Sequence, residues 1–183
     1  MNMKWIFFSY SLPTEPSKAR VHVWRQLKKL GAVSYQTVWV IPYSNDRLND
    51  LKKLTEDIKS YKGGSLLISG KVLNENQEEQ INKVFTESRN EEYHEFIEKC
   101  EDFFKEIASE IERKNFIFAE IEENEEELEK LKYWLKKIEK RDIIRPPLHK
   151  EAVKKIKTCE KRFEEFARRV YDHNHPKLSK KKF

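Results

Sequence analysis

Glycine and cysteine are scarce in this chain of 183 residues, and both shortages narrow its possible chemistry. There are four glycines, and none follows Gly70 in the sequence. The chain therefore lacks a glycine-rich loop that could wrap a phosphate group. The two cysteines, Cys100 and Cys159, do not have the close spacing of metal ligands. Each falls on the apolar stripe of an expected helix, so we expect buried, reduced thiols.

Other absences argue against whole classes of function. No apolar run reaches the roughly 18 residues of a membrane helix. The opening MNMKWIFF lacks the small-residue cleavage site of a signal peptide, so we expect a first strand there and a cytoplasmic protein. The motifs GxSxG, HExxH and CxxC are missing. Ser9, Ser11 and Ser17 have no recognisable His/Asp partners. We expect no enzyme activity, no catalytic residue, no metal and no cofactor.

Charge is distributed in three blocks along the chain. Residues 1–72 carry a net charge of +7, residues 73–129 of −14 and residues 130–183 of +12. Basic surfaces attract nucleic acids or small oxyanions. Either the acidic block folds against the basic ones, or the protein has two faces of opposite sign.

The acidic block contains the run EIEENEEELE at residues 120–129. Glu123 and Glu127 lie four residues apart on an expected helix and repel each other. We expect the basic last helix or the tail to compensate them. Metal binding by this run, or by His173 and His175, is not favoured, because neither has suitably spaced further ligands.

The first 73 residues alternate between strand and helix patterns. The spacing predicts a strand over 4–11, a helix with Ser17 as its N-cap and Gly31 as its stop, and a hairpin over 32–42. A second helix has Ser44 or Asn45 as its N-cap and stops at the glycine pair 63–64, and a strand covers 65–73. This strand–helix–strand–strand–helix–strand order is typical of ferredoxin-like folds.

The rest of the chain shows only helical periodicity. A polar, partly helical connector over 76–90 precedes three amphipathic helices, over 91–114, 117–140 and 148–171. Their short links favour antiparallel neighbours, either a three-helix bundle or a helical hairpin with a docking helix. The predicted fold class is therefore α+β. The predicted domains are a ferredoxin-like domain (1–75), the connector (76–90) and a helical domain (91–172). A disordered basic tail (173–183) follows.

The helix that starts at Ser17 carries the candidate functional residues. Its apolar stripe is formed by Ala19, Val23, Leu27 and Leu30. Basic side chains line the other side, with His22 among them, where they could meet successive phosphates. The predicted DNA or phosphate contacts are Lys18, Arg20, Arg25, Lys28 and Lys29. Ser17, Lys18 and Arg20 could also hold an oxyanion at the helix N-terminus. An ordinary solvated basic face is the alternative, and there is no convincing helix-turn-helix.

One block of this region resembles a known family. The pattern SYSLP-x-x-PS-x-x-RV-x-VWR-x-L-x-x-LGAV, at residues 9–33, is similar to the N-terminal domain of the chromate resistance protein ChrB. The resemblance extends over roughly 4–173 and lacks the C-terminal domain of larger members. It implies a chromate-responsive, DNA-binding regulator, with DNA as partner and chromate or another oxyanion as possible ligand. It does not assign a role to individual residues.

The element order also resembles the Cas2-like ferredoxin fold. Nucleases of that kind place an acidic residue at the end of the first strand, where this chain has Phe8-Ser9-Tyr10-Ser11. Nuclease activity is therefore not expected. Cas2-like domains often pair through their sheets, so the resemblance implies a possible homodimer. Two alternatives stay open, namely a protein–protein interaction module without DNA binding and a small-oxyanion binder or degenerate nuclease.

Overall fold

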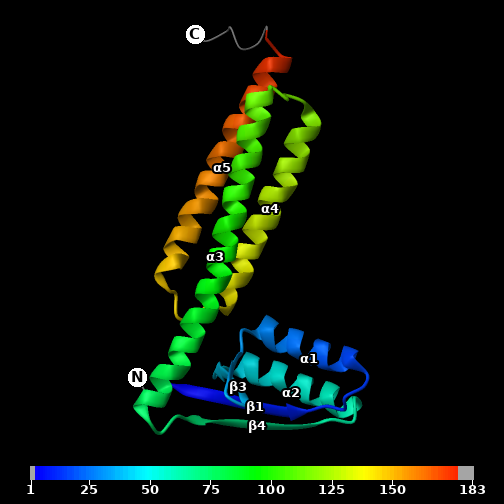
Figure 1. Cartoon of the computed structure of the whole chain (residues 1–183), viewed down its shortest axis with the longest axis vertical. Coiled ribbons are helices and arrows are strands. Elements are labelled where there is room, and N and C mark those ends of the chain that lie inside the picture. The colour runs from blue at the N-terminus through cyan, green and yellow to red at the C-terminus, as the bar shows by residue number, and fades with distance from the viewer. Residues whose placement is uncertain (1–2, 177–183) are drawn as a thin grey trace. The chain divides into compact units, whose positions relative to one another are not determined.

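The computed structural model describes residues 3–176 and has the α+β architecture that the sequence predicts (Figure 1). Its four strands form one antiparallel sheet, and five helices accompany them. The chain divides between Ser88 and Arg89 into two compact units. We call the described part of the first, residues 3–88, the sheet unit, and that of the second, residues 89–176, the helix unit. The elements are β1 (Lys4–Ser11), α1 (Ser17–Leu30), β2 (Val33–Tyr35), β3 (Val38–Pro42), α2 (Asn45–Ser60), β4 (Gly64–Lys71), α3 (Glu75–Arg113), α4 (Phe118–Arg141) and α5 (Pro147–Asn174).

The sheet unit is organised around β1. The strand order is β2-β3-β1-β4, so β1 pairs with β3 on one side and with β4 on the other. Helices α1 and α2 cover one face of this sheet. Ile6 and Phe8 point toward that face because alternate residues of a strand share a side. They share a buried cluster with residues of both helices, among them Val23, Leu27, Leu51, Leu54 and Ile58.

The first turns of α3 contact the opposite face of the sheet. Trp5, which alternates with Ile6, stacks on Phe85 with ring centroids 5.6 Å apart. The indole N–H of Trp5 donates to Glu78 Oε1 at 3.1 Å, and the backbone N–H of Met3 donates to the same oxygen at 3.0 Å. The hydrogen bond from Trp5, more than that from Met3, holds the pKa of Glu78 below its usual value. The first turns of α3 thereby shield this face from solvent around Trp5, which is fully buried.

The predicted polar connector over 76–90, expected to be partly helical, is helical throughout. The chain is helical without interruption over Glu75–Arg113, so the helix expected at residue 91 begins much earlier. Ile81 and Phe85 lie one turn apart and are buried. Three apolar residues, Ile81, Val84 and Phe85, stand among polar and charged residues over 76–90 and give only a weak periodic pattern, yet neither Gly nor Pro interrupts it.

The end of α2 also differs from the prediction. This helix stops at Ser60 rather than at the glycine pair, and Lys62 takes a positive φ of 60°. Gly63 serves a different need, because a Cβ at this position would lie 2.4 Å from the carbonyl oxygen of Ser11. Ser44 caps the start of α2, since its side chain accepts the backbone N–H of Arg47. This confirms one of the two predicted caps.

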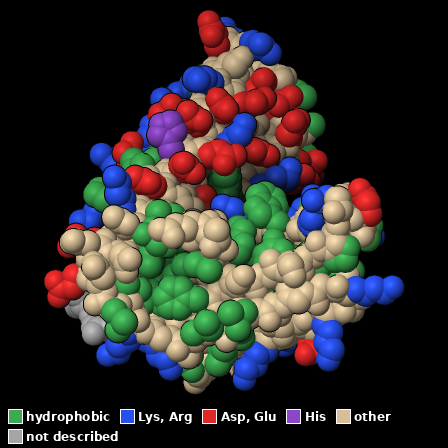
Figure 2. All heavy atoms as spheres, turned by 60° about the horizontal axis from the view of Figure 1, so that its bottom comes forward, with side chains coloured by type: hydrophobic (Ala, Val, Ile, Leu, Met, Phe, Trp, Pro, Cys, Tyr) green, Lys and Arg blue, Asp and Glu red, His purple; other side chains and the backbone are tan. Residues whose placement is uncertain are grey.

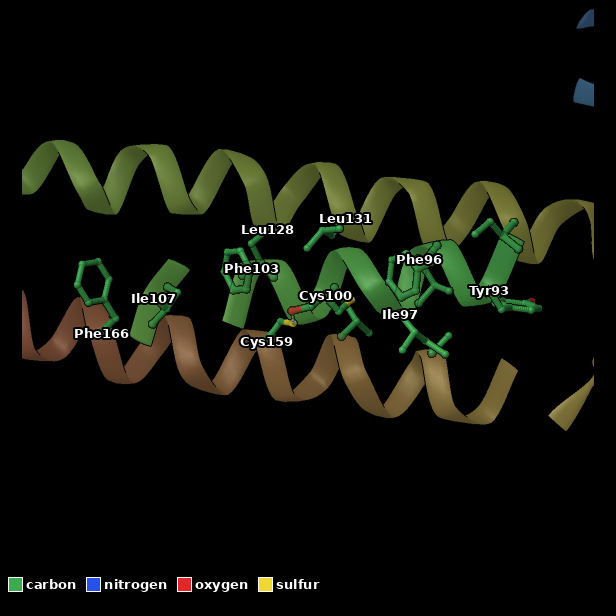
Figure 3. Packing of buried hydrophobic residues seen from close by; sticks show 14 of the residues in the cluster. Tyr93, Phe96, Ile97, Cys100, Phe103, Ile107, Leu128, Leu131, Cys159 and Phe166 are labelled. Atoms are coloured by element: carbon green, nitrogen blue, oxygen red, sulfur yellow. Dashed lines mark hydrogen bonds between the residues drawn. The ribbon is translucent and has the colours of Figure 1, made fainter. Parts of the chain in front are cut away.

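The helix unit has a core shared by α3, α4 and α5. Figure 3 shows aromatic and aliphatic side chains from these helices packed into one cluster. Cys100 on α3 and Cys159 on α5 are fully buried in it, which confirms the prediction of buried thiols. The Cys159 thiol lies 3.7 Å from the carbonyl oxygen of Cys100. Interaction between the two thiols, together with burial, raises the pKa of Cys100.

A buried carboxylate organises the link between α4 and α5. Asp142 Oδ1 accepts the backbone N–H groups of Ile144 and Arg145 at 3.0 and 2.9 Å. Its Oδ2 accepts the hydroxyl of Tyr93 on α3 at 2.7 Å. Burial and this hydrogen bond raise the pKa of Tyr93. One side chain thus connects α3 to the turn that precedes α5.

Two expectations about charge and the tail need correction. Within α4, Glu127 and Glu129 pair with Lys130 and Lys132, so for these two glutamates the compensation comes from their own helix and not, as predicted, from the last one. His173 belongs to α5, which continues to Asn174, so the predicted tail starts too early. Its residues 177–183 lie outside the described range. Over residues 3–176, no helix has the length and apolarity needed to span a bilayer.

Candidate functional site

Helix α1 owes its position to signals at both of its ends. Its N-cap is Pro16, in an extended conformation, and Ser17 is the first helical residue rather than the predicted cap. At the other end Gly31 takes φ 85° and its N–H bonds to the carbonyls of the last turn, which confirms the predicted stop. Ala19, Val23 and Leu27 are buried against the sheet unit's core. This fixes which side of α1 faces solvent.

All five predicted phosphate contacts are on the exposed surface of α1. Lys18, Arg20, Arg25, Lys28 and Lys29 are solvent-exposed. Within residues 3–176 none of them forms an ion pair. Their charges are therefore available to an anionic partner, and contact with it would not require an existing pair to break.

His22 does not share this freedom. Its Nε2 lies 3.1 Å from Oδ2 of Asp57 on α2, and its side chain is half-buried. The sequence pattern placed His22 among the cations of one face, but the structure gives it a partner within the fold.

The cations occupy two rows of α1 rather than one. Lys18, Arg25 and Lys29 follow the side of His22, which is directed toward α2. Arg20, Trp24 and Lys28 form a second row, because they follow one another at intervals of four residues and therefore lie on the same side of the helix. The exposed half of the helix is therefore basic over a broad angle. This arrangement suits contact with an extended anion better than a single line of charges would.

A shallow pocket of ≈ 330 Å³ opens beside the second row. It is lined by Tyr10, Ser17, Arg20, Val21 and Trp24, and thus includes two of the three predicted oxyanion residues but not Lys18. Sequence reasoning missed Tyr10, Val21 and Trp24. The sequence offered one signal for Trp24, because this large apolar residue follows Arg20 by one helical turn on the polar side of the helix. Trp24 is 49% exposed.

The chemistry of this pocket combines one cation with aromatic surface. The hydroxyl of Tyr10 is protonated at neutral pH, because the ordinary tyrosine pKa is 10.0 and burial raises that of Tyr10 further. The Ser17 backbone N–H, however, already donates to Glu15 Oε2 at 3.2 Å. A carboxylate of the chain itself thus occupies part of the helix N-terminus, and an oxyanion would have to displace it. Among residues 3–176, no group of three or more His, Cys, Asp or Glu side chains is arranged to hold a metal ion.

Comparison with known proteins identifies one similarity. The family model described as "Protein ChrB, N-terminal" matches residues 20–177. The match takes in α1 from Arg20 onward and every later element. No curated protein and no solved structure matches the chain significantly.

Proposed function

Because the chain belongs to the family of ChrB N-terminal domains, we propose that it is a DNA-binding transcriptional regulator of chromate-resistance genes. The family membership carries the association with chromate resistance. The regulator acts in the cytoplasm and without catalysis. The single observation that supports DNA as partner is the set of exposed cations on α1 that have no ion pair within residues 3–176.

The spacing of these cations fits a phosphate backbone. With a rise of 1.5 Å per helical residue, Lys18 and Arg25 lie about 10 Å apart along the axis, and Arg25 and Lys29 about 6 Å. Duplex DNA carries one charge for about every 1.7 Å of its axis, so each cation finds phosphates within reach. Strand β2 follows α1, in place of the second helix of a helix-turn-helix. These contacts therefore position the protein on DNA rather than read its bases.

The fold proposed for this function has two parts. The element order and the strand order β2-β3-β1-β4 support a ferredoxin-like arrangement of the sheet unit. The core shared by α3, α4 and α5 supports a three-helix bundle in the helix unit.

Salt-dependent binding tests the α1 assignment. A labelled duplex is titrated by fluorescence anisotropy at several salt concentrations, with the unaltered chain and with Arg25→Ala/Lys29→Ala. Loss of two phosphate contacts should weaken binding and reduce the slope of log K against log salt by about 1.8. The matched control is Lys154→Ala/Lys157→Ala, which removes two exposed cations of α5 instead.

The control distinguishes binding through a local site on α1 from a general attraction by the net charge of the protein. If both double variants weaken binding equally, attraction is general and α1 is not the interface. If Arg25→Ala/Lys29→Ala binds as tightly as the unaltered chain, the assignment is wrong.

The pocket beside Arg20 supports a second candidate, the binding of a small oxyanion such as chromate. Arg20 supplies a cation, and Tyr10 and Ser17, which both carry hydroxyl groups, line the same hollow. Competition from Glu15 makes this site weaker than an unobstructed helix N-terminus. A thermal-shift titration distinguishes the two ligands, since only the oxyanion candidate requires stabilisation by chromate or sulfate in the absence of DNA.

A further inference from the structure

Strand β4 is an edge strand without the usual protection. It lies at one end of the sheet and pairs with β1 along its whole length, from Gly64 to Lys71. Over the described residues, no strand pairs with its outer side. Edge strands of monomeric proteins are usually short or interrupted by charges or proline. Residues 64–70, GSLLISG, have neither charge nor proline.

The same strand exposes apolar side chains. Leu67 packs toward the core with α1 and α2, so Leu66 and Ile68 point to the opposite face. They are 58% and 50% exposed. Ile68 lies beside Phe7 of β1, which is half-buried. Figure 2, which looks on this side of the sheet unit, shows hydrophobic side chains gathered there.

The sequence of β4 is chemically palindromic about Leu67. Reading outward from this residue, Leu66 matches Ile68, Ser65 matches Ser69 and Gly64 matches Gly70. In an antiparallel pair of identical strands centred on Leu67, each residue would therefore face one of its own kind. In an interface between two copies related by a twofold axis, residue i meets residue j and residue j meets residue i. The palindrome makes each such meeting along β4 one between similar uncharged side chains, which favours pairing with a second copy.

We propose that two copies of this chain pair antiparallel through β4, about a twofold axis at Leu67, to form one continuous sheet. The unpaired backbone groups of β4 then form a ladder with those of the partner. Leu66 and Ile68 meet their counterparts in one apolar cluster. Lys71 faces Gly63 of the second copy, so like charges are not opposed. This interface is independent of the α1 cations and of DNA binding.

Molar mass in solution tests the surface. Light scattering coupled to gel filtration should give a dimer for the full chain at micromolar concentration. Ile68→Lys places a charge at the centre of the interface and should raise the dissociation constant by at least about 30-fold. Leu73→Lys is the matched control, because Leu73 lies just beyond β4 and is 99% exposed. Circular dichroism verifies that both variants fold.

Either of two results would overturn the proposal. One is a monomer for the unaltered chain. The other is a dimer that Ile68→Lys leaves intact or that Leu73→Lys disrupts equally.

Cysteine cross-linking tests the register. Directly opposed residues have Cβ atoms about 4.5–5.5 Å apart, and diagonal neighbours about 7–8 Å, which is too far for a disulfide. With the axis at Leu67, Leu66 faces Ile68 of the partner. A mixture of Leu66→Cys and Ile68→Cys chains should therefore cross-link under mild oxidation, and neither variant alone should do so. Native Cys100 and Cys159 are fully buried and do not compete. Cross-linking of Ile68→Cys alone would place the axis elsewhere and refute the palindromic pairing.

Discussion

Replacement of Tyr93 by phenylalanine should destabilise the helix unit by removing one buried hydrogen bond. Tyr93 is fully buried, and its hydroxyl donates to Asp142 Oδ2 at 2.7 Å. Tyr93→Phe keeps the ring but leaves this carboxylate oxygen without its side-chain donor. The loss of such a partner costs about 1–3 kcal/mol of unfolding free energy. Asp142 keeps its two backbone donors, so the turn before α5 should remain intact.

The raised pKa of Tyr93 also predicts that the unfolding free energy depends on pH. Because the pKa of Tyr93 is raised in the folded chain, the folded state keeps this proton where the unfolded state releases it. The stabilisation is complete below the ordinary tyrosine pKa of 10.0 and is lost as the pH rises above it. The slope for this one proton is at most about 1.4 kcal/mol per pH unit. The stability difference between the unaltered chain and Tyr93→Phe should therefore shrink above pH 10.

Urea unfolding followed by far-UV circular dichroism measures both effects. Tyr171→Phe is the matched control, because this tyrosine is 53% exposed and its removal should change stability by less than about 0.5 kcal/mol. A cost below about 0.5 kcal/mol for Tyr93→Phe at neutral pH would refute the reasoning. A difference between the two proteins that stays constant from neutral pH to pH 11 would refute the explanation of the raised pKa.

Three further substitutions test other parts of the account. Gly63→Ala would place a Cβ 2.4 Å from a carbonyl oxygen of β1 and should cost about 1–3 kcal/mol in urea unfolding, whereas Gly70→Ala, with open space around it, should cost little. Ser44→Ala removes the cap of α2 and should lower the unfolding free energy by about 1 kcal/mol, and an unchanged midpoint would contradict the cap. Arg20→Ala should abolish any thermal stabilisation by chromate or sulfate, while Lys59→Ala, on α2, should preserve it.

Local signals account for the parts of the fold that the sequence predicts well. The α1 stripe, the positive φ of Gly31 and the Ser44 cap depend on residues within a few positions of each other. The start of α3 was missed because its covering role depends on Trp5, some 80 residues earlier in the chain. Nothing in the local pattern of residues 76–90 reveals that partner.

The candidate site shows the same division. Exposure of its five cations follows from helical spacing and was predictable. The pairing of His22 with Asp57 depends on how α2 packs beside α1, and the placement of Glu15 at the helix N-terminus depends on the loop before it. Both features alter the electrostatics of the site. The His22–Asp57 pair spans 35 residues and requires proximity that spacing alone does not provide. The contact of Glu15 with Ser17 is local and was missed although the two residues are two positions apart.

DNA binding by the intact chain is the most direct test of the proposed function. The measurement is an anisotropy titration against the DNA upstream of the chain's own gene, with excess competitor DNA at about 150 mM salt, where non-specific binding is weak. The account predicts saturable binding that survives the competitor and that Arg25→Ala/Lys29→Ala weakens. Binding that the competitor abolishes, or that the double variant leaves unchanged, would contradict it.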